Sequence, residues 1–371
     1  MNDVWNYLSP VEILFGDGAL ARLPERVDTA AVLLVTDPHL AAAGITERVR
    51  GLLPDREVVV FADVEPNPSV ETINRCGRLA GEHKIGCVVG VGGGSSLDTA
   101  KAAALVAATG ADVAEYLDGK RKVEKHSIPV IAVPTTAGTG SEVTPVSVIT
   151  WTARHCKQPL VSPYLFPALA IVDPELTYSM PATVTAATGM DALSHGLEAY
   201  WSRGAMPVTD ALAIGCITRV LPFLGRAVRN GDDREARREM ALASLLGGLA
   251  FALPKTAAVH ACSFPLTSRF GVPHGTACAL TLAAFVEFNY PALQGKMDVL
   301  FQCCGVRSLG EFADAVRALH AQVGLPTRLS QCGVRAEDMD TLVAESFHPN
   351  MRNNPKEVTP HDLTDIYRRL L

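Results

Sequence analysis

The first half of the chain alternates short apolar runs with stretches of helical spacing. Runs rich in β-branched residues predict buried strands at 31–37, 56–64, 87–94 and 129–136. Between them, apolar residues recur at helical intervals over 45–53, 69–84 and 95–108. Because these strands are apolar throughout rather than alternating, they predict a parallel sheet with helices on both faces. The runs 146–150 and 168–173 predict an additional strand pair that carries substrate or cofactor contacts.

The pattern of apolar and polar residues changes near Pro181. Long amphipathic stretches rich in alanine and leucine follow, at 182–202, 208–228, 233–253 and 308–324. Thr359 and Pro360 have the residue types of an N-cap and a first helical position, so they predict the start of the last helix. We therefore expect an α/β domain over 1–180 and an all-helical domain over 181–371, divided near the proline-containing segment 173–181.

Composition excludes several classes of protein. The 371 residues are 48% hydrophobic and 19% charged, with a net charge of -6, which is typical of a packed protein that does not bind nucleic acid. No stretch offers the roughly 20 uninterrupted apolar residues of a membrane span, and the first residues lack signal-peptide features. Nine cysteines without regular spacing favour reduced thiols and a cytoplasmic location. We expect Cys262 and Cys278 to be small buried apolar residues.

Four residues of the second half have the chemistry of a metal site. Asp191 and His195 stand four apart in a predicted helix, so their side chains share a face. His260 and His274 follow within one short window. One carboxylate and three imidazoles suit ferrous iron or zinc, and a metal with a vacant position polarises a carbonyl or alkoxide oxygen.

Two loops in the first half suit a nucleotide. The segment 90–101 follows a predicted strand and begins a helix, so its glycines let the backbone approach a pyrophosphate. The segment 134–144 leaves the next strand and is rich in hydroxyl groups, although Ser141 and Glu142 also fit a capping turn. Asp37 ends an early strand, where a carboxylate binds the adenosine ribose and repels a 2′-phosphate; the alternative is a turn aspartate before Pro38.

These segments resemble the iron-containing (group III) alcohol dehydrogenase family. The resemblance rests on the motifs at 90–101, 134–144 and 170–181, the Asp191/His195 pair and the His260–His274 spacing, and it extends over almost the whole chain. It implies a dehydroquinate-synthase-like fold, with an NAD-binding domain, an all-helical metal-binding catalytic domain and the active site between them. It also implies an NAD(H)-dependent aldehyde reductase that uses Fe²⁺, with Zn²⁺ as the alternative, and that forms a homodimer.

The resemblance assigns roles residue by residue. The metal ligands of the family fall on Asp191, His195, His260 and His274. Its cofactor contacts fall on Asp37, Gly92, Gly93, Gly94, Ser95, Asp98, Thr135, Thr136, Ser141 and Lys157, where Asp37 selects NAD and the glycines hold the pyrophosphate.

One position departs from the family pattern. Many members have a histidine for proton transfer four residues after the third ligand, where this chain has Phe264, so water or the cofactor ribose must serve instead. The aromatic side chain and the surrounding residues resemble a subgroup associated with phosphonate metabolism. That subgroup implies reduction of phosphonoacetaldehyde to 2-hydroxyethylphosphonate. Such a substrate needs fixed cations, and the candidates are Lys255, Arg269 and Arg352, each of which also fits a solvated surface cation.

Three alternatives remain open. Another small aldehyde, diol or ulosonate sugar is the alternative substrate within the same family. A sugar-phosphate cyclase of the dehydroquinate synthase type has a Glu-His-His shell, whereas this chain offers one aspartate and three histidines. A binding or scaffold protein without activity has support only from Phe264.

Overall fold

The computed structural model describes residues 4–124, 127–154 and 156–371, and the chain divides into two compact units. The sheet unit comprises Ser9–Thr136 and Ser141–Thr177. The helical unit comprises Ala137–Gly140, Tyr178–Leu371 and the described part of Met1–Leu8. The chain thus contributes Ala137–Gly140 to the helical unit from within a loop whose two flanks belong to the sheet unit.

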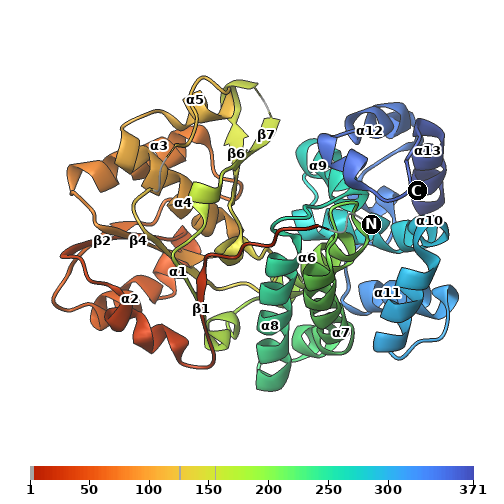
Figure 1. Cartoon of the computed structure of the whole chain (residues 1–371), viewed down its shortest axis with the longest axis horizontal. Helices are drawn as coiled ribbons and strands as arrows, with labels where there is room; N and C mark the ends of the chain where they lie inside the picture. The colour runs from red at the N-terminus through yellow and green to blue at the C-terminus, as the bar shows by residue number, and fades with distance from the viewer. Residues whose placement is uncertain (1–3, 125–126, 155) are drawn as a thin grey trace. The chain divides into compact units, whose positions relative to one another are not determined.

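The sheet unit is built on a parallel sheet (Figure 1). Its strand order is β1 (Glu12–Phe15), β8 (Leu169–Val172), β5 (Val130–Pro134), β4 (Cys87–Gly92), β2 (Ala31–Val35) and β3 (Glu57–Phe61). The α-helices of this unit are α1 (Pro38–Ala42), α2 (Ile45–Leu52), α3 (Val70–Glu82), α4 (Gly94–Thr109) and α5 (Val113–Leu117). The four predicted strands are present, each shorter than expected.

Both faces of this sheet are covered, as the apolar strands predict. Along β2, Val32 and Leu34 pack in one hydrophobic cluster with Ile45 of α2. Leu33, between them, packs in a second cluster with Ala100 of α4. Because successive side chains of a strand point to opposite faces, a strand buried on both faces is apolar at every position.

The prediction of an extra strand pair from 146–150 and 168–173 is wrong. The segment β6 (Val146–Trp151) pairs antiparallel with β7 (Cys156–Val161), and β8 instead joins the main sheet between β1 and β5. Both segments are short apolar runs, and such runs do not specify their partner, because pairing depends on long-range packing.

The sheet places the two predicted nucleotide loops together. The register of β4 and β5 sets Gly92 beside Pro134, so the loops that follow both strands leave the same edge. Ligands of parallel α/β sheets bind at this carboxyl edge.

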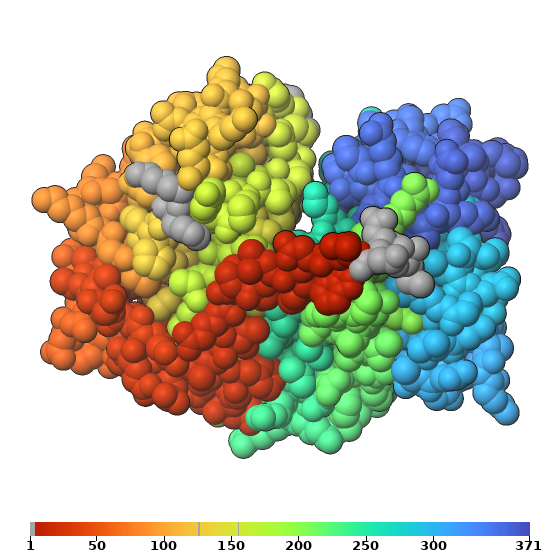
Figure 2. Space-filling model, in the orientation of Figure 1, coloured from red at the N-terminus to blue at the C-terminus, as the bar shows by residue number. Residues whose placement is uncertain are grey.

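The helical unit contains only helices within its described residues. The α-helices among them are α6 (Ala182–Trp201), α7 (Pro207–Arg229), α8 (Arg234–Phe251), α9 (Ala258–Phe270), α10 (His274–Cys303), α11 (Leu309–Gln322), α12 (Met339–Glu345) and α13 (Pro360–Leu370). Figure 2 shows the surface of this unit, which is coloured mainly from green to blue. Thr359 caps α13 by accepting a hydrogen bond from the Asp362 N–H, which confirms the predicted start.

One helix departs from the expected absence of membrane-length segments. In the part of the chain that the structure describes, α7 has the length and apolar composition of a membrane span. It packs against α6 and α8, and its Asp210 accepts a 2.8 Å hydrogen bond from Lys296 of α10. Helices in the core of a globular protein can have the same length and apolar composition as a membrane span.

Candidate metal centre

Helix α6 presents three acidic or imidazole side chains on one face. Asp191, His195 and Glu198 are separated by four and three residues, which brings their side chains into line along the helix. All three are buried, and the Glu198 side chain has no exposed surface. Buried ionisable groups of this kind need partners or a bound cation.

The other two predicted ligands lie at the starts of neighbouring helices. His260 is in the first turn of α9, and His274 is the first residue of α10. Gly275 allows α10 to approach α6, because a Cβ atom there would lie 2.0 Å from the Ala187 carbonyl oxygen. The close approach brings His274 to Asp191.

Three of the predicted ligands surround one carboxylate oxygen of the fourth, Asp191. Oδ1 of Asp191 lies 3.5 Å from Nε2 of His260, 3.7 Å from Nε2 of His274 and 3.9 Å from Nε2 of His195. Two ligand atoms about 2.1 Å from one tetrahedral ion would be roughly 3.4 Å apart, so these separations fit a small divalent cation.

Unpartnered atoms support the same conclusion. Asp191 Oδ1 and His260 Nε2 are buried, yet neither has a hydrogen-bond partner among the described residues. Leaving such groups without a partner costs about 1–3 kcal/mol each. A cation between them would satisfy both atoms.

The remaining ring nitrogens are held so that each Nε2 faces the centre. Nδ1 of His195 lies 3.2 Å from the Gly138 carbonyl oxygen, to which it donates in the matching tautomer. Nδ1 of His274 lies 3.3 Å from Oγ of Ser263, whose own proton is donated to the His260 carbonyl. Fixing Nδ1 as the protonated nitrogen leaves the Nε2 lone pair free for a metal.

Glu198 orients the third imidazole and was missed by the sequence analysis. Its carboxylate lies 2.5 Å from Nδ1 of His260 and accepts hydrogen bonds from the N–H groups of Ala257 and Val259. Glu198 follows His195 by three residues in a predicted helix, and this spacing could have indicated that the two side chains share a face. A carboxylate behind a ligating histidine orients the ring and raises its basicity.

Two pKa shifts describe charge states within the centre, an ionised Asp191 and a neutral His195. Burial opposes ionisation of Asp191, but His195, His274 and His260 outweigh it and hold the pKa of the carboxyl well below its usual range. Burial lowers the pKa of His195 to about 4, which keeps this ring neutral. Neutral imidazoles and an ionised carboxylate are the forms that bind metals.

The centre is open on one side. The His274 side chain is 38% exposed, whereas the side chains of Asp191 and His260 are each 5% exposed. Phe264 stacks against His274 with ring centroids 6.4 Å apart, and its ring is tilted against that of His348 with centroids 4.6 Å apart. Catalytic metal sites keep one position accessible to substrate, and the His274 side provides one here.

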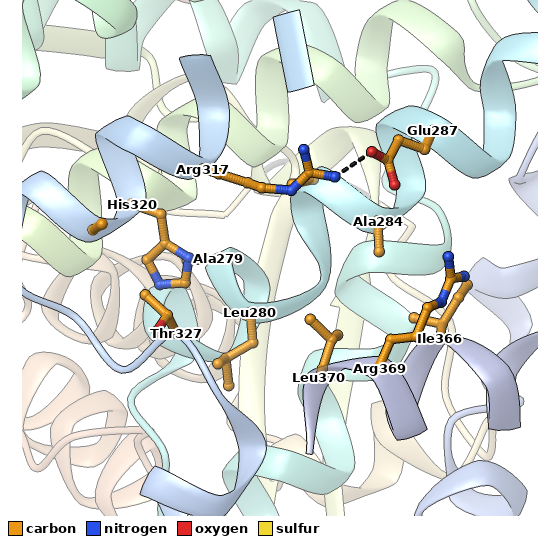
Figure 3. Close-up of a pocket in the computed structure, with 12 residues that line it drawn as sticks. Ala279, Leu280, Ala284, Glu287, Arg317, His320, Thr327, Ile366, Arg369 and Leu370 are labelled. Atoms are coloured by element: carbon orange, nitrogen blue, oxygen red, sulfur yellow. Dashed lines mark hydrogen bonds and ion pairs between the residues drawn. The ribbon is translucent and has the colours of Figure 1, made fainter. Parts of the chain in front are cut away.

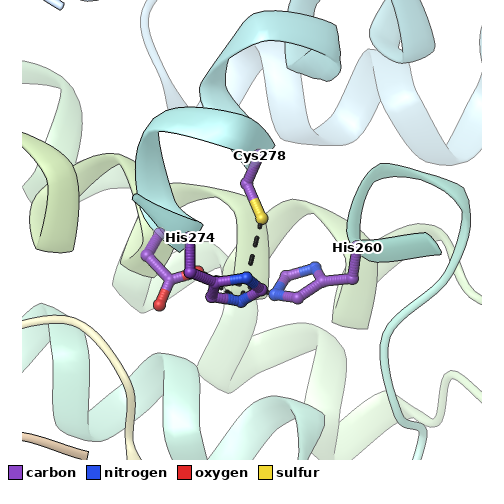
Figure 4. A group of neighbouring side chains, drawn as sticks. His260, His274 and Cys278 are labelled. Carbon is purple, nitrogen blue, oxygen red and sulfur yellow. Dashed lines mark hydrogen bonds and ion pairs between the residues drawn. The ribbon is translucent and has the colours of Figure 1, made fainter. Parts of the chain in front are cut away.

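Cys278 is buried, as expected from the sequence, and it also joins this group. Its Sγ lies 4.0 Å from Nε2 of His274, and the two side chains occupy one face of α10 (Figure 4). The potential ligand atoms of Asp191, His260, His274 and Cys278 all lie within 4.8 Å of one another. Burial opposes ionisation of the thiol, but His260 and His274 outweigh it and lower its pKa.

In the sheet unit, the glycine loop has the expected form. Gly92 has a φ of 154°, Gly93 is the N-cap of α4 and Gly94 is its first residue. A Cβ on Gly92 would lie 2.4 Å from Oγ of Ser96, so only glycine fits at this turn. The N-terminus of α4 therefore directs N–H groups and partial positive charge towards the carboxyl edge of the sheet.

Asn67, missed by the sequence analysis, links two predicted cofactor residues. Its N–H donates to Oγ of Ser95 at 3.1 Å, and its side-chain oxygen accepts from Nζ of Lys157 at 2.8 Å. The structure thus brings Ser95 and Lys157 together although they lie far apart in sequence. The Asn-Pro-Ser sequence at 67–69 indicates a turn but not these partners.

Asp98 and Ser141 lie in a buried polar network. Oγ of Ser141 donates to Oδ1 of Asp98 at 2.6 Å, and the buried Lys101 ammonium lies 3.0 Å from the same oxygen. Oδ2 of Asp98 accepts from the Val148 N–H. These contacts fix β6 onto α4, and contact of either residue with NAD stays a prediction.

The other predicted cofactor residues lie at the same carboxyl edge. The Thr135 N–H donates to the Gly92 carbonyl at 3.0 Å, and Thr136 follows it. Asp37 caps α1, with Oδ1 accepting from the N–H groups of His39 and Leu40. The capping role foreseen as the alternative is therefore present, and it occupies one oxygen of the carboxylate.

The predicted substrate cations differ in their surroundings. The exposed Arg269 pairs through two nitrogens with Glu345, so its charge is already neutralised. Lys255 and Arg352 are both exposed. The segments that carry them are tied together, because Asn353 donates to the carbonyl oxygens of residues 254–256.

A separate cavity of about 460 Å³ lies among α10, α11 and α13. Figure 3 shows Arg317 paired with Glu287 on one side and His320 on another. None of the predicted site residues lines this cavity.

Comparisons with known proteins identify the family. Residues 10–174 match iron-containing alcohol dehydrogenase, and residues 185–371 match the C-terminal part of the Fe-containing alcohol dehydrogenase family. Alcohol dehydrogenase 4 of Schizosaccharomyces pombe is 37% identical, over 96% of this chain and 86% of its own length. The NAD-dependent methanol dehydrogenase of Bacillus methanolicus is 36% identical, over 99% of this chain and 100% of its own.

A solved structure is also closely similar. The sulfoacetaldehyde reductase from Bifidobacterium kashiwanohense in complex with NAD⁺ has a TM-score of 0.96 and 39% identity, covering 99% of this chain and 98% of that one. The matches span both units, so the chain is an oxidoreductase that uses NAD(H) and a divalent metal. It belongs to the iron-containing alcohol dehydrogenase family.

Proposed function

We propose that this enzyme uses NADH to reduce a short aldehyde with a tetrahedral anionic group at its far end, and that phosphonoacetaldehyde is its preferred substrate. The observation that carries the proposal is the 39% identity to a sulfoacetaldehyde reductase over nearly the whole chain. Sulfoacetaldehyde and phosphonoacetaldehyde share a two-carbon aldehyde and differ in the charge of the terminal group.

The metal centre serves the carbonyl end of the substrate. A divalent metal bound by Asp191, His195, His260 and His274 supplies Lewis-acid polarisation of the carbonyl oxygen, worth several kcal/mol in the transition state. Glu198 and the Gly138 carbonyl hold His260 and His195 in the tautomer that this binding requires. NADH supplies the hydride.

The loop around Lys255 serves the anionic end. Lys255 adopts a left-handed conformation, with φ of 67°, which a non-glycine residue rarely takes without support. Asn353 provides that support through three carbonyl contacts, and Asn350 adds a 2.8 Å hydrogen bond to Oγ1 of Thr256. A strained backbone held by surrounding contacts is common at functional sites.

Charge favours the phosphonate over the sulfonate. Lys255 and Arg352 lie on segments joined by these asparagines, and together they offer two positive charges. A phosphonate carries up to two negative charges near neutral pH, whereas a sulfonate carries one. Arg269 is left out of the proposed anion site because Glu345 neutralises it.

Phe264 lies beside the open side of the centre. Its ring packs between His274 and His348, where it limits the access of water to the open side of the centre. Removing water strengthens charge interactions nearby. The proton that completes the alcohol then comes from water or from the cofactor ribose, as expected from the sequence.

The test is a comparison of kcat/KM, measured by NADH oxidation in the metal-loaded enzyme. The substrates are phosphonoacetaldehyde, sulfoacetaldehyde and two neutral aldehydes, butanal and 3-hydroxypropanal. We expect kcat/KM to be highest for phosphonoacetaldehyde, lower for sulfoacetaldehyde and lowest for the neutral aldehydes. Equal or higher kcat/KM with the neutral aldehydes would contradict the proposal. Net oxidation of NADH also excludes a cyclase, which returns its hydride to the product.

A further inference from the structure

The cluster around Asp191 contains one more potential donor than the four ligands predicted from the sequence. Cys278 lies one helical turn after His274, so both side chains point to the same side of α10. Figure 4 shows its sulfur directed at the His274 ring, beside His260. The sulfur is buried, with no exposed surface on the residue.

We propose that Cys278 is a thiolate ligand of the metal, giving a centre of one carboxylate, three imidazoles and one sulfur. This inference rests on the metal-dependent function proposed above. It adds a donor of a different class to the predicted nitrogen and oxygen shell.

Distances within the cluster support the sulfur as a donor. A zinc ion with bonds of about 2.3 Å to sulfur and about 2.1 Å to nitrogen holds these two atoms roughly 3.6 Å apart. The observed separation between Cys278 Sγ and His274 Nε2 is 4.0 Å, so a small rotation of the Cys278 side chain closes the difference. The unpartnered Asp191 Oδ1 and His260 Nε2 belong to the same group of four converging atoms.

His195 occupies a different position around Asp191. Its ring stacks on Phe251 with centroids 4.1 Å apart and on His260 at 4.7 Å. Asp191, His260 and His274 therefore belong to two possible sets of four ligands. His195 completes one set, and Cys278 completes the other. Five protein donors exceed the usual four of a structural zinc site.

A sulfur donor changes which metal the centre prefers. Thiolates are soft ligands that favour zinc, whereas a set of imidazoles and a carboxylate also suits ferrous iron. Cys278 should therefore raise the affinity for Zn²⁺ more than the affinity for Fe²⁺.

The test uses the full-length enzyme loaded with Co²⁺, whose spectrum reports its ligands. A thiolate bound to Co²⁺ produces a strong charge-transfer absorption in the near ultraviolet. We expect this band in the wild-type enzyme and its loss in Cys278→Ala and Cys278→Ser, with one equivalent of Co²⁺ still bound. Cys262→Ala is the matched control, because Cys262 is also buried and lies two residues after His260 but outside the converging group. That variant should keep the band.

Competition with a chromogenic chelator gives a second readout. Loss of the Cys278 thiolate should weaken Zn²⁺ binding by at least about tenfold, since even residues behind the ligands contribute tenfold to hundredfold. The ratio of Zn²⁺ to Fe²⁺ affinity should fall in the same variants and stay constant in Cys262→Ala.

The outcomes separate this inference from the proposed function. Stoichiometric Co²⁺ binding without a charge-transfer band, or a band that persists in Cys278→Ala, would overturn the ligand assignment. Neither result would affect the reduction of anionic aldehydes. A wild-type enzyme that shows the band but reduces no anionic aldehyde would contradict the proposed function and leave Cys278 as a ligand. Failure to bind Co²⁺ would overturn both.

Discussion

The Glu198 carboxylate and the His260 imidazole form a buried pair, with Oε2 and Nδ1 2.5 Å apart. The same carboxylate accepts from two backbone N–H groups at the start of α9, so it fixes both the ring and the turn that carries it. The position of His260, a predicted metal ligand, thus depends on a residue outside the predicted ligand set.

Replacing Glu198 should weaken the metal centre. A glutamine has only one accepting oxygen for three donors, so Glu198→Gln should lower metal affinity about 10–100-fold. The measurement is metal content after dialysis against a graded chelator, with thermal unfolding to confirm that the variant folds. His260→Ala, which removes the predicted ligand itself, should lose the bound metal and the activity. Unchanged metal affinity in Glu198→Gln would show that the pair serves only packing.

Asp37 should govern the choice between NADH and NADPH. Because its Oδ1 caps α1, Asp37→Gly would change both the charge and the helix start. Asp37→Asn tests the charge alone, since asparagine caps helices equally well but carries no charge. We expect the wild-type enzyme to have a higher kcat/KM with NADH than with NADPH. The ratio of these two values should be smaller in Asp37→Asn. A wild-type enzyme that favours NADPH would contradict the assignment.

Lys255 should act on anionic aldehydes alone. Alanine and lysine have the same difficulty with the left-handed φ of 67°, so Lys255→Ala removes the charge without a new backbone cost. We expect kcat/KM for phosphonoacetaldehyde to fall on the order of 10²-fold, which corresponds to roughly 3 kcal/mol for one charge-assisted contact. The value for butanal should change little.

Arg269→Ala is the matched control for this prediction. It removes another exposed cation of the same unit, but one already paired with Glu345. Its kcat/KM for both aldehydes should stay near that of the wild type. An equal loss for neutral and anionic substrates in Lys255→Ala would mean that the lysine has a structural role.

Glu142 should make the protein less stable as the pH rises. Burial raises the pKa of this carboxyl to about 7 in the folded protein, whereas the unfolded value is about 4.5. The folded state therefore binds more protons between these two values, and the free energy of unfolding falls as the pH increases through that window.

Glu142→Gln tests this by replacing the carboxyl with a neutral group of the same shape. At pH 8 the variant should be more stable than the wild type by on the order of 1–3 kcal/mol, and the difference should shrink towards pH 5. Urea unfolding at both pH values provides the measurement. An identical pH dependence in the two proteins would contradict the prediction.

Local patterns in the sequence predicted much of the fold and the site. The apolar strands, the cap at Thr359 and the alignment of Asp191 with His195 follow from the periodicity of a single element, so neighbouring residues suffice to predict them. Contacts between residues far apart in the sequence could not be predicted from local patterns. Nothing near β8 specifies that it pairs with β1 and β5, and nothing near Asn67 indicates its contacts with Ser95 and Lys157.

Cys278 marks the same limit within the site. A buried cysteine in an apolar helix has the same sequence pattern as a residue that only packs, and its proximity to His260 depends on how α9 and α10 meet. Its spacing of four residues after His274 was visible in the sequence, but that spacing fits many helical pairs.

The position of β8 has a consequence for folding during synthesis. In the described sheet, β1 pairs only with β8, and almost the whole sheet unit separates them along the chain. The first strand to leave the ribosome must therefore wait for the last strand of its sheet, with its backbone N–H and C=O groups unpaired in the meantime. Closing so long a loop is slow, which places the docking of β1 and β8 among the late events of folding. A ribosome that stalls before β8 would leave a nascent chain with an open sheet edge and a need for chaperones.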